Sequence, residues 1–193
     1  ALKTISTRGA LSFVARSFIA TIGTFVFFEI LPHFAVGVSE VHLILGSTLF
    51  LMLGVGPAGV GLALGLLIQG MFFAPQDLPQ FFMNVTTLLV PLFALQAVAK
   101  RTIAKDTAYV DLGYAQALKL SVAYQGGVVA WVAFWVIWGQ GFAAMAEIMT
   151  FGAAYMTVVL LEPLVDLAVL GIAKSLKGLK GSGLVEERLH NAA

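Results

Sequence analysis

Long apolar runs separated by short polar loops make up most of the chain. A membrane-spanning helix needs about 20 mostly apolar residues, and the pattern predicts four single crossings, at residues 10–31, 85–99, 114–138 and 143–173. A further apolar stretch, residues 42–73, is interrupted at Gly54–Pro57. By pattern alone it could form one long tilted helix or two short ones.

The positions of Lys and Arg decide between these two structures. Cytoplasmic loops of membrane proteins are enriched in both residues, so the basic loop 100–113 is expected inside the cell. Residues 32–41 contain neither Lys nor Arg and are expected outside. Residues 74–84 precede a single crossing into the basic loop, so they are expected to form an external or partly re-entrant loop. The stretch 42–73 therefore begins and ends outside, which predicts a hairpin of two short helices.

These elements predict an all-α, polytopic integral membrane protein with about six transmembrane helices and both chain ends in the cytoplasm. We interpret residues 1–193 as a single membrane domain, with residues 1–9 as the remnant of a loop and residues 181–193 as a frayed cytoplasmic tail. The sequence begins without an initiator Met, and a missing N-terminal helix would raise the number of crossings to seven. Arg16, about two turns into the first span, is expected to extend its charged end to the membrane surface.

Composition agrees with this assignment and excludes several kinds of chemistry. Hydrophobic residues make up 60% of the 193 residues and charged residues only 11%, whereas soluble domains typically carry about 25% charged residues. The chain has no cysteine, which excludes disulfides, thiolate metal sites and cysteine nucleophiles.

Candidate ligands gather where the second apolar stretch begins. His33 and Glu40 lie in the external loop, and His42 stands at the mouth of the apolar run that follows. A histidine beside a short, broken helix is an arrangement with which transporters hold a ligand in the membrane. It could equally be a helix-end histidine that hydrogen-bonds a backbone carbonyl. His33 could pair with His42, but two imidazoles and Glu40 would make only a generic, weak metal site.

Further polar and small residues could serve either packing or a site. Gly61 and Gly65 form a G-x-x-x-G pair, which lets helix backbones approach closely and which we interpret as helix packing rather than binding. Asn84 opens an apolar run and could be an N-cap or a polar lining group. Glu162 and Asp166 are four residues apart and share one helix face. Such a pair is costly in a membrane unless it faces an aqueous path, a partner or the cytoplasmic rim.

Three stretches of the chain resemble one family of transporters. They are VSEVHLILGSTL at 38–49, GPAGVGLALGLLIQGMFFAPQDLPQFFMN at 56–84, and a late acid followed by apolar residues at 162–169. Together they resemble the CbiM/NikM family, the substrate-capturing membrane component of energy-coupling factor importers for cobalt and nickel. The stretch GVSEVHLILGSTLF also resembles sequences of a shorter proteobacterial branch of energy-coupling factor permeases.

The resemblance implies a site, a substrate and a location. It implies divalent cobalt or nickel as the transported substrate, no bound organic cofactor, and the bacterial inner membrane. The family's nitrogen ligands come from the N-terminal amine, from a histidine at position two of the mature sequence and from a loop-proximal histidine, which His42 matches. The Met-His start is absent from this sequence. Asn84 and Glu162 match a family asparagine and a family acid, and with His33 and Glu40 they are candidate lining residues of the substrate path.

Three functions compete for this chain. The first is metal capture and import with a membrane scaffold subunit and ATP-binding subunits, because the chain itself lacks the G-x-x-x-x-G-K-[ST] phosphate loop. The second is a non-catalytic structural or accessory subunit of a larger membrane complex, which keeps the CbiM-like fold without the metal site. The third, an intramembrane enzyme, is disfavoured because the chain has neither H-E-x-x-H nor G-x-S-x-G. No nucleic-acid partner is expected.

Overall fold

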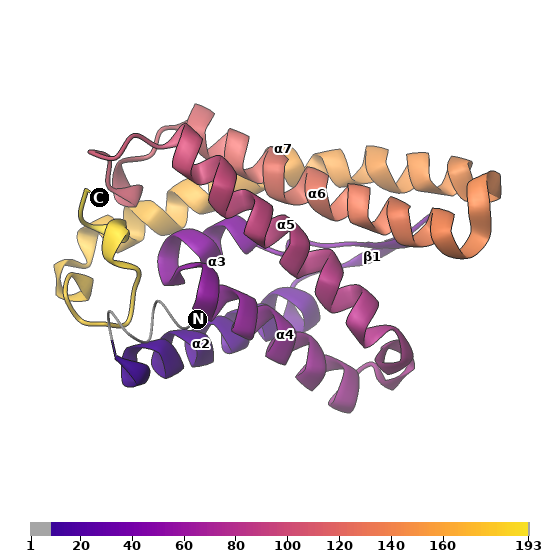
Figure 1. Ribbon diagram of the computed structural model, residues 1–193, viewed down its shortest axis with the longest axis horizontal. Helices are drawn as coiled ribbons and strands as arrows, with labels where there is room; N and C mark the ends of the chain where they lie inside the picture. Colours follow the sequence, from indigo (N-terminus) through magenta and orange to yellow (C-terminus); the bar gives the residue numbers. More distant parts are fainter. Residues whose placement is uncertain (1–8, 193) are drawn as a thin grey trace.

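The computed structural model describes residues 9–192, and nearly all of its regular structure is helical (Figure 1). The prediction of an all-α membrane protein is confirmed, and the predicted loop remnant at residues 1–9 lies, apart from Gly9, outside the described residues. The elements in chain order are α2 (Ala10–Phe25), η1 (Val26–Ile30), β1 (Phe34–Val36), β2 (Ser39–Val41), α3 (Gly46–Leu53), α4 (Val55–Phe72), η2 (Pro75–Gln80), α5 (Phe81–Thr102), η3 (Tyr109–Asp111), α6 (Tyr114–Gln140), η4 (Gly141–Ala144), α7 (Met145–Ser175), η5 (Lys177–Leu179) and η6 (Glu187–Leu189).

Four stretches of the described chain are long and apolar enough to cross a membrane. They are Ala10–Ile30, Val55–Phe72, Pro75–Thr102 and Tyr114–Ser175. The last stretch contains both α6 and α7. With 27 and 31 residues, these two helices are about 40 and 46 Å long at 1.5 Å per residue. Both are therefore longer than the roughly 30 Å hydrocarbon core of a bilayer.

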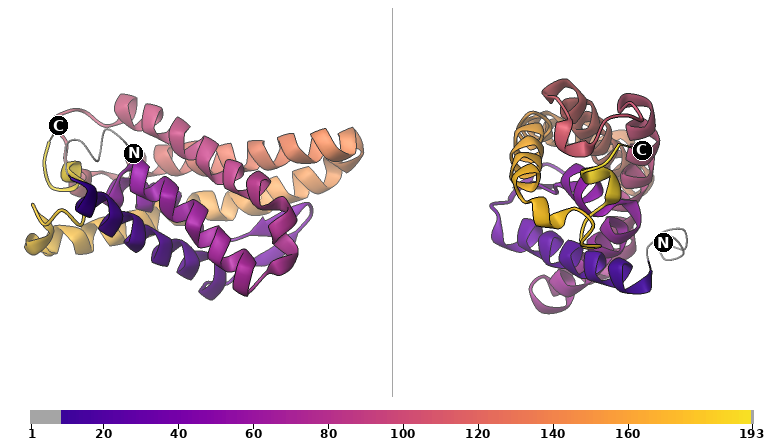
Figure 2. Two further views of the ribbon diagram at one scale, coloured as in Figure 1. Left: turned by 60° about the horizontal axis from the view of Figure 1, so that its bottom comes forward. Right: turned by 90° about the vertical axis from the view of Figure 1, so that its left-hand side faces the viewer.

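Helices α2 and α4 run side by side in the same direction (Figure 2). Gly61 packs on Ala20 and Gly65 packs on Thr24, so successive turns of α4 meet successive turns of α2. Beyond these contacts, the Phe25 and Phe73 rings lie 5.1 Å apart. Two parallel helices need a return segment between them, and residues 42–54 provide it.

The return segment passes through the middle of the bundle as an extended stretch followed by α3. Its residues from Ile44 to Leu51 are all buried, and α3 contacts α2, α4, α5, α6 and α7. Leu45 has the left-handed backbone conformation, with φ of 53°, where the extended stretch turns into the helix. The prediction of two short helices over residues 42–73 therefore needs correction. The first pass is an extended stretch followed by a helix of 8 residues, and the second is α4, which is a full 18 residues long.

Both loops that were predicted to be external contain structure that the sequence pattern did not predict. Residues 32–41 contain an antiparallel hairpin of β1 and β2, with Phe34 paired to Val41. At the hairpin turn Gly37 has a φ of +59°, and a side chain there would overlap the backbone of Glu147 on α7. In the second loop, Pro75–Gln80 forms a 3-10 helix and α5 already begins at Phe81.

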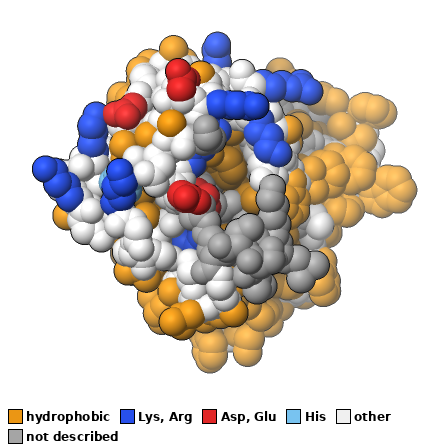
Figure 3. Space-filling view, turned by 60° about the vertical axis from the view of Figure 1, so that its left-hand side comes forward, with side chains coloured by type: hydrophobic (Ala, Val, Ile, Leu, Met, Phe, Trp, Pro, Cys, Tyr) orange, Lys and Arg blue, Asp and Glu red, His pale blue; other side chains and the backbone are white. Residues whose placement is uncertain are grey.

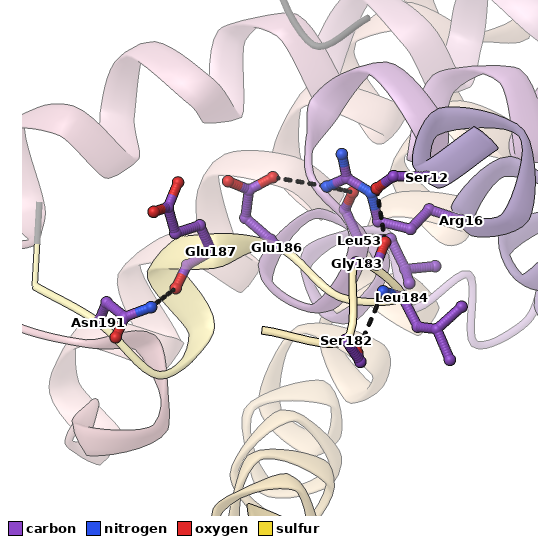
Figure 4. Close-up of polar contacts among 9 residues, drawn as sticks. All are labelled: Ser12, Arg16, Leu53, Ser182, Gly183, Leu184, Glu186, Glu187 and Asn191. Atoms are coloured by element: carbon purple, nitrogen blue, oxygen red, sulfur yellow. Dashed lines mark hydrogen bonds and ion pairs between the residues drawn. The ribbon is translucent and has the colours of Figure 1, made fainter. Parts of the chain in front are cut away.

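The C-terminal tail is packed against the bundle, which corrects the prediction that it is frayed. Leu189 is fully buried, and the Glu186 amide donates a hydrogen bond of 2.7 Å to the Met52 carbonyl at the end of α3. Arg16 is also buried rather than extended to the membrane surface. Its Nη1 lies 3.0 Å from the Leu53 carbonyl and 2.9 Å from Glu186 Oε2 (Figure 4).

The two ends of the bundle differ in their charged residues. Lys and Arg side chains gather on the end formed by the 100–113 loop, the end of α7 and the tail (Figure 3). At the opposite end, the β-hairpin, η2 and η4 contain no Lys or Arg but carry or adjoin Glu40, Asp77 and Glu147. The return segment runs from this acidic end to the basic end, because Gly37 adjoins Glu147 and Met52 adjoins Glu186.

Candidate functional site

His33 and His42 flank the open end of the β-hairpin. Phe34 and Val41 form the outermost pair of the ladder, so His33 comes one residue before β1 and His42 one residue after β2. Because their neighbours Phe34 and Val41 are paired, the hairpin brings the two histidines near one another, close enough for His33 to influence the pKa of His42. The sequence pattern did not predict this hairpin.

The His42 imidazole sits in an apolar setting where the return segment leaves the hairpin. Its ring contacts Phe28 edge-on, with 4.3 Å between ring centroids. Burial, and secondarily the nearby His33, lowers the pKa of His42 to about 4. The ring is therefore neutral near pH 7, which is the form of histidine that binds metals.

One nitrogen of His42 is not used by the fold. Nδ1 is buried and accepts or donates no hydrogen bond within the described part of the chain. A buried polar atom without a partner is uncommon in folded proteins and costs stability. The sequence also allowed His42 to hydrogen-bond a backbone carbonyl, and its Nδ1 makes no such bond within residues 9–192.

The other candidates do not complete a metal site around His42. Glu40 and His33 are exposed, and the His33 Nδ1 lies 3.4 Å from the Leu31 carbonyl oxygen. Within residues 9–192, no group of three or more His, Asp or Glu side chains is placed to hold a metal ion. His42 is accordingly a single candidate ligand with His33 beside it.

Asn84 lies apart from the histidines, inside the first turns of α5. The N-cap of that helix is Gln80, so Asn84 is not a cap. It lines a small pocket between the end of α4, η2 and the start of α5, and Gln69, Asp77 and Phe81 also line this pocket. Neither His42 nor Glu162 contributes to its walls.

Glu162 and Asp166 belong to a buried polar cluster that joins α3, α6 and α7. Ser47 Oγ lies 2.9 Å from Glu162 Oε1 and 2.8 Å from Asp166 Oδ2. Thr48 donates to the other oxygen of Asp166, and Gln125 Nε2 donates to the other oxygen of Glu162. Both acids are fully buried.

The residues of α3 and α6 that complete this cluster were not predicted from the sequence. Ser47 and Thr48 stand in an apolar run beside Gly46, at which a side chain would overlap the Tyr124 ring. A signal was present, because two hydroxyl residues and a glycine begin a short helix in an otherwise apolar segment. The return segment therefore links two polar places, His42 at its external start and the acid pair that meets Ser47 five residues later.

Comparison with known proteins identifies one family. A family model named CbiM, described as the cobalt uptake substrate-specific transmembrane region, matches residues 5–178. Neither curated proteins nor solved structures gave a significant match.

Proposed function

Since the chain belongs to the CbiM family of cobalt uptake transmembrane components, we propose that it captures a divalent cobalt or nickel ion through His42 and delivers it inward. The observation that carries the proposal is the unpartnered, buried Nδ1 of a neutral His42 at the external start of the return segment. An imidazole nitrogen suits both metals. The metal in this proposal is the transported substrate, and no organic cofactor is involved.

Energy for import is supplied by other proteins in this proposal. The sequence has no phosphate-binding G-x-x-x-x-G-K-[ST] loop, so ATP-binding subunits and a membrane scaffold subunit act with it in the bacterial inner membrane. The family is one of transport components rather than enzymes. Residues 1–193 act as one membrane domain, and His33, Glu40, Asn84 and Glu162 are candidates for lining the route of the ion.

Uptake of radioactive cobalt by cells that produce the complete transporter tests the proposal. Loss of one metal ligand is expected to cost at least as much as loss of its supporting partners, about 10–100-fold in affinity, so His42→Ala should lower uptake at limiting cobalt by about that factor. His190→Ala is the control, because it removes the imidazole of the C-terminal tail, which lies at the opposite end of the bundle from His42. Equal uptake by the wild type and His42→Ala would reject His42 as a ligand and favour the accessory-subunit alternative.

A further inference from the structure

Within residues 9–192, the two acids of the buried cluster have no positively charged partner. Glu162 and Asp166 are both 0% exposed and lie one turn apart near the middle of α7. The ion pairs found among the described residues, Arg16–Glu186 and Lys174–Asp111, do not involve them. Two unpaired carboxylates in such a place would carry a large desolvation cost and would repel one another.

The two contacts of the Ser47 hydroxyl need one more hydrogen than this group can supply. Its Oγ is within hydrogen-bond distance of one oxygen from each acid, at 2.9 Å and 2.8 Å. A hydroxyl has one hydrogen to donate, so it can donate to only one of the two acids. The second short contact is a hydrogen bond only if the other acid is protonated and donates to the Ser47 oxygen.

The rest of the cluster leaves room for that one proton. Thr48 and Gln125 donate to the outer oxygens of Asp166 and Glu162, so each acid already accepts one hydrogen bond on the side away from Ser47. The groups facing the pair are Ser47 and Thr48 from α3, Tyr124 and Gln125 from α6, and Tyr155 from α7. None of these groups carries a positive charge near neutral pH.

Buried polar atoms without partners provide a second and independent observation. Gln125 Oε1 and the hydroxyls of Tyr124 and Tyr155 make no hydrogen bond within residues 9–192, although all three side chains are buried. The Gln125 amide is directed into the cluster, because its nitrogen contacts Glu162. The two tyrosines also face Glu162, so the buried space around the acids contains polar atoms that the described side chains leave unsatisfied.

We propose that Glu162 and Asp166 together bind one exchangeable proton, which they share through the hydroxyl of Ser47. In one state the Glu162 carboxyl donates to Ser47 Oγ and the Ser47 hydroxyl donates to the Asp166 carboxylate. Transfer of the Glu162 proton to Ser47 Oγ, with release of the Ser47 proton to Asp166, gives the mirror state with Glu162 ionised. The number of protons and the charge of the cluster are unchanged by this exchange.

A proton fits this cluster better than a metal ion does. The atoms that could bind a metal here are carboxylate and hydroxyl oxygens, whereas nickel and cobalt are well suited to imidazole nitrogen. A hard cation would need oxygens at about 2.0–2.6 Å around it, but the Ser47 hydroxyl already lies in direct contact with both acids. Because Ser47 and Thr48 belong to α3, the shared proton also joins the return segment to α7.

Infrared spectroscopy of the purified protein tests the proposal without any metal, so its failure would leave the proposed function standing. The wild type should show the carbonyl stretch of a protonated carboxylic acid at pH 7, and the band should shift in D₂O because the proton exchanges. Glu162→Gln and Asp166→Asn should each remove the band, since one remaining acid with its donors can ionise. Glu147→Gln, which alters an exposed acid on the same helix, should leave it intact.

The possible outcomes separate the proposal from its alternatives. Absence of the band in the wild type at pH 7 would overturn the proposal, and this result does not depend on whether any variant folds. A band that falls by half in each single variant would show two independent protons and would overturn sharing. A band that survives in the Glu162→Gln/Asp166→Asn double variant would place the proton elsewhere.

Discussion

Among single residues, Arg16 connects three parts of the basic end of the bundle. It belongs to α2, donates to the last carbonyl of α3 and pairs with Glu186 of the tail. Its Nε and Nη2 have no partner within residues 9–192. A fully buried guanidinium depends strongly on an anionic partner such as Glu186, since an unpaired buried charge is costly.

We predict that Glu186→Ala destabilises the protein by about 3 kcal/mol, the lower end of the cost of breaking a buried ion pair. Arg16→Met should cost less, because the Glu186 side chain left behind is 23% exposed and can be hydrated. Thermal unfolding in detergent measures both. The control is Asp111→Ala, which breaks the exposed pair with Lys174 and should cost at most about 1 kcal/mol. Equal losses for Glu186→Ala and Asp111→Ala would contradict a special role for the buried pair.

His42 could be singled out from the sequence, whereas the burial of Arg16 could not, and the difference has a physical cause. His42 stands at a boundary between polar loop and apolar run, which the pattern displays directly. Burial of Arg16 depends on Glu186 in the tail, far away along the chain. Because no local pattern reports such a distant partner, the side chain could only be assigned its ordinary role of reaching the membrane surface.

At the scale of elements, the contact between α2 and α4 depends on two glycines. A Cβ on Gly61 would lie 2.6 Å from the Ala20 carbonyl carbon, and one on Gly65 would lie 2.6 Å from Thr24 Cβ. Both values are well below van der Waals contact, so α4 can approach α2 this closely only with glycine at these positions. The interpretation of the G-x-x-x-G pair as a packing motif is supported by this geometry.

Gly61→Ala and Gly65→Ala should each destabilise the protein by about 1–3 kcal/mol, the usual cost of overpacking a tight contact. Gly126→Ala is the matched control, because that glycine is also in a transmembrane helix but has nothing within 4 Å of an added Cβ. The control should be neutral or slightly stabilising, since alanine favours helix more than glycine does. If all three variants unfold at the same temperature, the close approach of α2 and α4 is not important for stability.

The long helices could be predicted from the sequence, whereas the short elements could not. Spans such as α2, α6 and α7 are imposed by the bilayer, which demands continuous apolar helices. The two strands have only three residues each and are held by docking of Gly37 on α7, a tertiary contact. The eight residues of α3 cannot cross a bilayer alone, and their polar pair Ser47 and Thr48 is explained only by the acids of α7.

At the scale of the whole molecule, the return segment fixes the topology. Since α2 and α4 run in parallel, the chain must pass back through the bundle between them, from the acidic end to the basic end. With Lys and Arg at the cytoplasmic side, the β-hairpin, η2 and η4 face outward. The positions of Lys and Arg along the sequence predict the same even number of passes over residues 42–73.

Single cysteines test this topology cleanly, because the chain contains none of its own. A cysteine replacing Asp77 in η2 should react with a membrane-impermeant thiol reagent added outside intact cells. A cysteine replacing Lys105 in the basic loop should react only after the membrane is opened. Labelling of the Asp77 position only from the cytoplasm would mean that residues 42–73 cross the membrane once, which would contradict the return through α3.

Metal content decides whether His42 captures a metal ion. Elemental mass spectrometry should be applied to protein purified from its natural gene, beside its His42→Ala variant prepared in the same way. We predict near-stoichiometric cobalt or nickel in the wild type and its loss in the variant, with both proteins equally well folded. Absence of metal from both proteins would contradict metal capture and would favour an accessory subunit that keeps only the fold.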